Sequence, residues 1–152
     1  MILFSSEIEF EFRNKIKMNK LIIDAVSEKI FLMIISNDSI YNITHENTKI
    51  NYEKLTIIVN DFLLSKNIKI TDINVIYINQ GSGSFAGIRN SISVVKAFNV
   101  AKNIDYYCYK LDDFKDEKDL SHENIPNLCK KYKIKKNLKK ILVHQKKIKK
   151  FL

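Results

Sequence analysis

The chain has 152 residues, 45% of them hydrophobic, which is enough for one domain with a buried core. Two cysteines are too few for a disulfide framework, and no apolar run approaches the roughly 18 residues of a membrane span, so we expect a reduced, cytoplasmic protein. The net charge of +9 is confined to residues 115–152, which hold 13 Lys and 4 acidic residues, whereas residues 1–114 hold 13 residues of each sign.

Three short strands are expected first, after a second methionine, Met18. They are joined by links too short for a crossover, which predicts an antiparallel meander over residues 20–26, 29–36 and 39–44. The apolar period then becomes helical over residues 52–67, with Asn51 as the predicted N-cap. A buried strand at 74–78, a second amphipathic helix ending near Asn103, and a strand at 105–110 follow.

The order of elements is therefore β-β-β-α-β-α-β. Three antiparallel strands followed by right-handed crossovers predict a mixed sheet covered by helices, an α/β fold of ribonuclease H type. We expect residues 1–17 to be an N-terminal extension, 18–114 to be the folded lobe and 115–152 to be a lysine-rich tail.

All three glycines of the chain fall in one stretch, QGSGSFAGIR, between the fourth strand and the second helix. Their spacing, GxGxxxG, is one residue longer than the dinucleotide-binding fingerprint, and the lysine of a P-loop is missing. We therefore expect a tight strand-to-helix turn in which Gly83 or Gly87 adopts positive φ.

Catalytic residue sets are not apparent elsewhere. His45, His122 and His144 are far apart and lack the spacing of metal ligands, so we expect surface histidines and predict neither a catalytic nor a metal-binding set. Cys108 alternates within a strand and is expected in the core. Asp24 ends the first strand, where it would serve either a phosphate or metal site or a strand-end turn.

The strand LIID, ending at Asp24, together with INQGSGSFAGIR before a helix, resembles the TsaB (YeaZ) family of bacterial proteins. The resemblance covers about residues 18–114 and implies a ribonuclease H-like, actin-like lobe. Asp24 matches the family's first-strand acid. The loop residues that match in register are Gly81, Gly83, Ser84, Phe85, Gly87 and Arg89.

The resemblance implies a non-catalytic subunit. TsaB-type proteins assist the catalytic subunit TsaD, together with the ATPase TsaE, in forming threonylcarbamoyladenosine at position 37 of tRNAs that decode ANN codons. No cofactor of its own is implied, although ATP or ADP at a partner interface is compatible with the family. The two helices of the lobe would contact TsaD or a second copy of the chain, and the candidate contacts are Ile57 and Leu64, which lie opposite the predicted core face.

Departures from the family pattern bear on the alternatives. Ala25, Val26 and Ala86 replace family residues, among them hydroxyl groups suited to phosphate or metal, which argues against a small nucleotide-binding enzyme of the sugar-kinase and actin superfamily. Family members continue into a second lobe. In this chain we expect the lysine-rich tail either to replace that lobe or to be a truncated form of it.

The tail itself admits three interpretations. Lysines between Lys130 and Lys150 would add a weak tRNA contact, as in a basic nucleic-acid-binding module. A solvated tail is the second interpretation. The third is that its apolar residues cover surface left bare by the second lobe, and these residues are Leu138, Ile141, Leu142 and Ile148.

Overall fold

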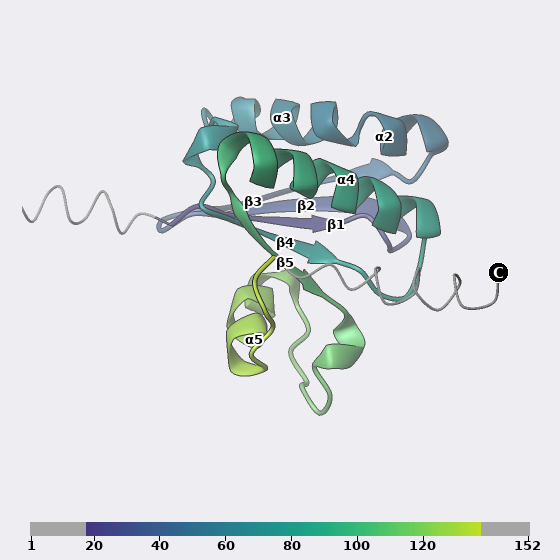
Figure 1. Ribbon diagram of the computed structural model, residues 1–152, viewed down its shortest axis with the longest axis vertical. Coiled ribbons are helices and arrows are strands. Elements are labelled where there is room, and N and C mark those ends of the chain that lie inside the picture. Colours follow the sequence, from purple (N-terminus) through teal and green to yellow (C-terminus); the bar gives the residue numbers. More distant parts are fainter. Residues whose placement is uncertain (1–17, 138–152) are drawn as a thin grey trace, which may run out of the picture.

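The computed structural model describes residues 18–137, which form a five-stranded mixed sheet with helices on one face (Figure 1). Residues 111–137, which we call the cap, cover the other face. The strand order across the sheet is β3-β2-β1-β4-β5. The strands are β1 (Lys20–Asp24), β2 (Lys29–Ile35), β3 (Ile40–Glu46), β4 (Val75–Asn79) and β5 (Asp105–Tyr109). The predicted α/β fold and the predicted order of elements are confirmed.

Strand β1 lies at the centre of the sheet and separates its two halves. It pairs antiparallel with β2, which continues the meander to β3, and parallel with β4, which pairs parallel with β5. Leu21, Ile22 and Ile23 are fully buried, because helices cover one face of β1 and the cap covers the other. The chain leaves β1 toward β2 and leaves β4 toward β5, so the carboxyl ends of β1 and β4 flank a topological switch point.

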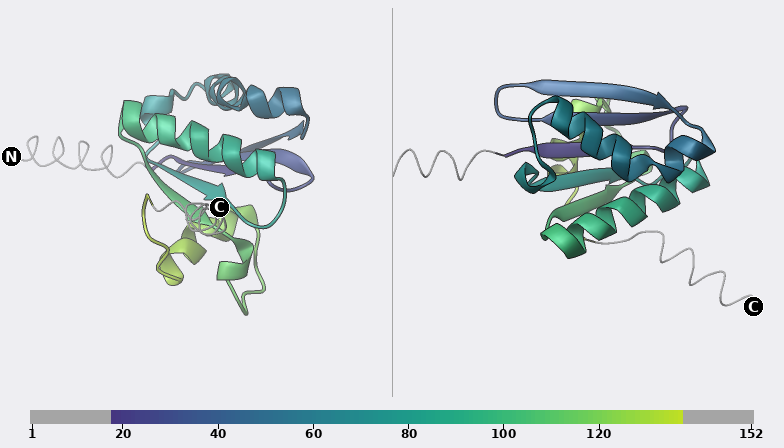
Figure 2. Two further views of the ribbon diagram at one scale, coloured as in Figure 1. Left: turned by 45° about the vertical axis from the view of Figure 1, so that its right-hand side comes forward. Right: turned by 90° about the horizontal axis from the view of Figure 1, so that it is seen from above.

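Helices pack side by side in one layer on the first face (Figure 2). Helix α4 (Phe85–Lys102) begins at Ser84, whose side chain caps it, and ends at Asn103, which adopts the left-handed conformation common at helix ends. The predicted end near Asn103 is therefore correct. None of the helices within residues 18–137 is both long enough and apolar enough to cross a bilayer.

The first predicted helix is broken in two, α2 (Lys49–Glu53) and α3 (Leu55–Ser65), with Lys54 outside helical geometry. Its predicted N-cap was wrong. The Thr48 hydroxyl accepts the N–H of Asn51 at 3.2 Å, while the Asn51 side chain donates to the carbonyl of Glu46 at 2.8 Å. Thr48 supplies the oxygen that the first turn requires, and Asn51 ties that turn back to β3.

The cap on the second face of the sheet includes helix α5 (Ile125–Lys131), which carries Pro126 in its first turn. Ile125, Leu128 and Cys129 are at most 2% exposed and pack against β1, β2, β4 and β5. The packed structure therefore continues past the boundary expected at residue 114, and the solvated-tail interpretation does not hold for residues 115–137. The apolar residues predicted at 138, 141, 142 and 148 lie outside the described residues.

The cap makes a testable contribution to stability. Leu128→Ala should lower the free energy of unfolding by about 2–5 kcal/mol, because it leaves a cavity between α5 and the sheet. Leu120→Ala is the matched control, since Leu120 is 39% exposed and should lose little. Urea denaturation of the full chain measures both, and equal small losses would mean that the cap does not pack on the sheet.

Candidate functional site

The glycine-rich turn, residues 81–84, joins β4 to α4 and lies against the carboxyl end of β1. The Ser84 N–H donates to the carbonyl of Val26 at 3.0 Å, and its side-chain oxygen accepts the N–H of Gly87 at 3.0 Å. Ser84 therefore links the start of α4 to the segment between β1 and β2.

Close backbone approach explains why glycine occupies two of these positions. A Cβ atom on Gly87 would overlap the carbonyl oxygen of Ala25, and one on Gly83 would overlap the carbonyl oxygen of Val26. The predicted positive φ is confirmed for Gly83, which has a φ of 158°, and was wrong for Gly87, which lies within the right-handed helix α4. Gly83 therefore combines a backbone conformation that favours glycine with close packing, whereas Gly87 serves close packing alone.

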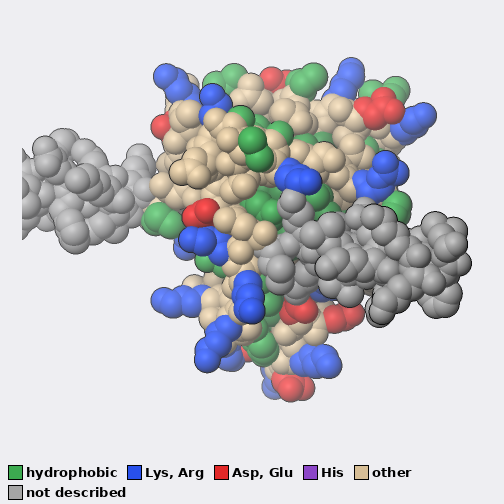
Figure 3. All heavy atoms as spheres, viewed as in Figure 1, with side chains coloured by type: hydrophobic (Ala, Val, Ile, Leu, Met, Phe, Trp, Pro, Cys, Tyr) green, Lys and Arg blue, Asp and Glu red, His purple; other side chains and the backbone are tan. Residues whose placement is uncertain are grey.

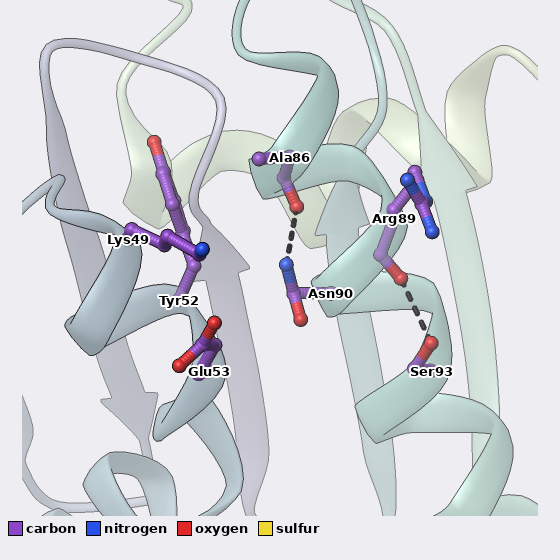
Figure 4. Close-up of a pocket in the computed structure, with 7 residues that line it drawn as sticks. All are labelled: Lys49, Tyr52, Glu53, Ala86, Arg89, Asn90 and Ser93. Carbon is purple, nitrogen blue, oxygen red and sulfur yellow. Dashed lines mark hydrogen bonds between the residues drawn. The ribbon is translucent and has the colours of Figure 1, made fainter.

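Beside this turn, a surface pocket of about 450 Å³ separates the first turns of α2 and α4 (Figure 4). Its wall on α4 includes Arg89, which is exposed like Phe85 one turn earlier, and the Arg89 guanidinium lies 5.9 Å from the Phe85 ring centre. The residues that line the pocket are Lys49, Tyr52, Glu53, Ala86, Arg89, Asn90 and Ser93. Of the predicted loop residues, two are buried and three are exposed: Gly81 and Gly87 are buried, whereas Gly83, Phe85 and Arg89 are exposed.

A polar cluster around the buried carboxylate of Asp24 lies on the cap face at the switch point. Asp24 is 3% exposed, and its Oδ2 lies 2.9 Å from Nε2 of His122. The Ser27 hydroxyl donates to the same carboxylate at 3.2 Å, and the N–H of Val26 lies 3.3 Å from Oδ1. Asn79, at the end of β4, also hydrogen-bonds to the carboxylate.

The cluster keeps Asp24 ionised. Burial alone would raise the pKa of its carboxyl group, but hydrogen bonds from His122 and Asn79, the charge of His122 and the N–H of Val26 together outweigh it and lower the pKa. The same carboxylate lies near Tyr109, whose hydroxyl pKa is raised mainly by burial and further by this negative charge.

His122 was predicted to be a surface histidine, and about a third of its side chain is exposed (34%), but it also connects the cap to the sheet. Its ring stacks on Phe31 with 3.9 Å between ring centres, and it joins the cap to Asp24 across 98 positions of sequence. No local pattern indicates a pair so far apart in the chain, so sequence reasoning found Asp24 but missed its partner. His45 lies on β3, and His144 falls outside the described residues.

The donors around Asp24 restrict its chemistry. Ser27 bonds the carboxylate rather than the imidazole, so the arrangement differs from a nucleophile activated by a histidine base. No group of three or more metal-ligating side chains is found among residues 18–137. The cluster is well suited to fastening the cap onto the sheet.

Comparison with known proteins identifies the fold. No protein-family model and no curated protein matches the chain. Among solved structures, YeaZ from Pseudomonas aeruginosa matches with a TM-score of 0.56 and 18% identity, over 61% of this chain and 44% of that one. A second structure, an uncharacterized protein with similarity to peptidase YeaZ from P. aeruginosa, gives the same score and identity and is covered over 43% of its length. RuvC from T. thermophilus, in complex with a Holliday junction substrate, reaches only 0.46 at 10% identity.

The predicted fold class is therefore confirmed: the sheet and its helices have the fold found in YeaZ. The chain spans less than half the length of either YeaZ-type structure that it matches.

Close packing of the glycine turn predicts different costs for adding one methyl group. Gly87→Ala should lower the free energy of unfolding by about 1–3 kcal/mol, because the new Cβ meets a backbone carbonyl that cannot move without shifting β1. Ser82→Thr is the matched control, since it adds a methyl group to an exposed residue of the same turn. Thermal melts that are equally unaffected by both substitutions would contradict the close approach.

The ionised Asp24 predicts a stability difference that depends on pH. Because folding lowers the pKa of Asp24 from 3.8, its stabilisation is complete at neutral pH and is lost as the pH falls through the lowered pKa. Urea titrations should therefore show Asp24→Asn less stable than wild type at pH 7, with the gap closing below about pH 4. A gap that stays constant down to acid unfolding would mean that the charge contributes nothing.

Proposed function

We propose that this chain is a non-catalytic partner subunit of TsaB type, which acts with a TsaD-type catalytic subunit and a TsaE-type ATPase in threonylcarbamoyladenosine formation on tRNA. The observation that carries the proposal is the placement of the glycine motif. In a lobe with the fold of YeaZ, GSGSFAGIR runs from the turn after β4 into the start of α4, and two of its glycines lie against backbone carbonyl groups that leave no room for a side chain. Two glycines of the sequence motif are therefore residues that this fold needs for close backbone packing.

The environment of Asp24 favours a partner role over the alternative of a nucleotide-binding enzyme. An acid that served a magnesium–phosphate group would present its oxygens to the ligand. Here His122, Ser27 and the N–H of Val26 already engage both oxygens, and the carboxylate is buried under the cap. ATP or ADP, where it takes part, would bind at the interface with the partner, and we place this activity in the cytoplasm.

The outer face of the helical layer supplies a surface for such a partner. Ile50, Ile57 and Leu64 are 60%, 58% and 52% exposed and recur at intervals of seven residues along α2 and α3. Glu53 and Asp61 are exposed on the same two helices. An exposed apolar row among charged residues is typical of a protein contact, here with the TsaD-type subunit or with a second copy of the chain.

This surface can be tested by charge insertion. Ile57→Glu combined with Leu64→Glu should abolish co-purification with the TsaD-type subunit of the same cell, while the melting temperature changes little, because both side chains are exposed. Leu120→Glu, an exposed apolar position on the cap, is the control and should keep binding. Undiminished binding by the double variant would exclude this face as the contact.

A further inference from the structure

A second pocket, of about 460 Å³, lies on the opposite face of the sheet, between the strands and α5. Its floor is formed by Tyr77 and Tyr107 on neighbouring strands, and its rim carries Lys20, Lys130 and Lys133. Pro126, in the first turn of α5, forms part of its wall. The volume falls within the range of sites for small molecules and cofactors.

Among residues 18–137, the side chains that line this pocket carry positive charge and no negative charge. No acidic residue lines it, and none of its three lysines has an ion-pair partner among residues 18–137. Two nearby lysines differ, since Lys131 pairs with Glu117 and Lys136 pairs with Asp105. Figure 3 shows Lys and Arg side chains gathered over the surface formed by α5. Three unpaired ammonium groups around one cavity are suited to an anion with several oxygen atoms.

The aromatic floor adds a second kind of recognition. The rings of Tyr77 and Tyr107 stack with 5.3 Å between their centres and 12° between their planes. Tyr77 is 7% exposed, whereas Tyr107 is half-buried and keeps part of its ring open to the pocket. A tyrosine ring held in place by a neighbour is a ready surface for stacking a planar heterocycle.

The backbone holds the two lysines of the α5 end in place. Lys133 has a φ of 53°, and its N–H donates to the carbonyl of Lys130 at 3.2 Å, while the N–H of Ile134 donates to the carbonyl of Cys129 at 2.9 Å. At the ends of α3 and α4 the same left-handed conformation is taken by Asn67 and Asn103, residues that tolerate it better than lysine. The turn thus fixes the backbone from which both lysine side chains reach the pocket.

We propose that this pocket binds a nucleotide, either free or as a unit of an RNA chain, with its phosphate among Lys20, Lys130 and Lys133 and its base against Tyr107. Phosphate accounts for the uncompensated positive rim, and the base accounts for the stacked aromatic floor. The site lies on the cap face, away from the helical face assigned to the protein partner, and it does not depend on that assignment.

Fluorescence anisotropy of mant-labelled AMP, titrated with the full chain at low salt, tests this inference directly. Lys130→Ala combined with Lys133→Ala should weaken binding at least roughly tenfold, since each variant loses a charged phosphate contact. Lys96→Ala combined with Lys118→Ala removes the same charge from exposed positions outside the pocket and should leave binding within about twofold. Equal weakening by both pairs would overturn the proposal, because the attraction would then be general.

Two further arms separate the base from the phosphate and the free nucleotide from RNA. Tyr107→Leu, checked for an unchanged melt, should weaken AMP binding several-fold but leave competition by inorganic phosphate unaltered. Phosphate that competes as well as AMP, with no effect of Tyr107→Leu, would overturn the nucleotide assignment. A short single-stranded oligoadenylate that binds more tightly than AMP, and remains sensitive to both variants, would support recognition within RNA. If neither AMP nor the oligoadenylate binds, the proposal is overturned.

Discussion

The close approach of the β4–α4 turn to the end of β1 is the constraint on which the arrangement of this lobe depends. The backbones at Gly83 and Gly87 lie against the carbonyl groups of Val26 and Ala25, and Ser84 joins the same segments by hydrogen bonds. This contact sets where α4 begins. Because α4 packs on the sheet beside α3, it also positions the helical face that we assign to a protein partner.

A second constraint acts on the other face of the same strand end. Asp24 points to the cap side, where His122 binds its carboxylate and stacks on Phe31. Ile125 and Leu128 pack against the sheet, and the hydrogen bond between Asp24 and His122 lies just before the start of the final helix. One strand end therefore organises both sides of the molecule, with backbone packing on the helical side and the hydrogen bond of Asp24 to His122 on the cap side.

Much of the fold could be predicted from the sequence, because alternating and helical apolar periods reflect burial directly. The strands and the end of α4 at Asn103 followed from such local signals. Thr48 was missed as the N-cap of α2 because Asn51 is an equally good N-capping residue. Only the contact of Asn51 with β3 distinguishes the two. His122 and the packed cap were missed for a different reason: their partners lie far away in sequence, and charged residues between 115 and 137 mask the few buried ones.

The central claim is that the chain supports tRNA modification without performing the chemistry itself. Reconstitution with the TsaD-type and TsaE-type proteins of its own cell, followed by mass spectrometry of the digested tRNA, measures this directly. The account predicts that threonylcarbamoyladenosine forms only when this chain is present, and that the Ile57→Glu, Leu64→Glu variant fails to support it whereas Leu120→Glu succeeds. Full modification in the absence of the chain would contradict the account.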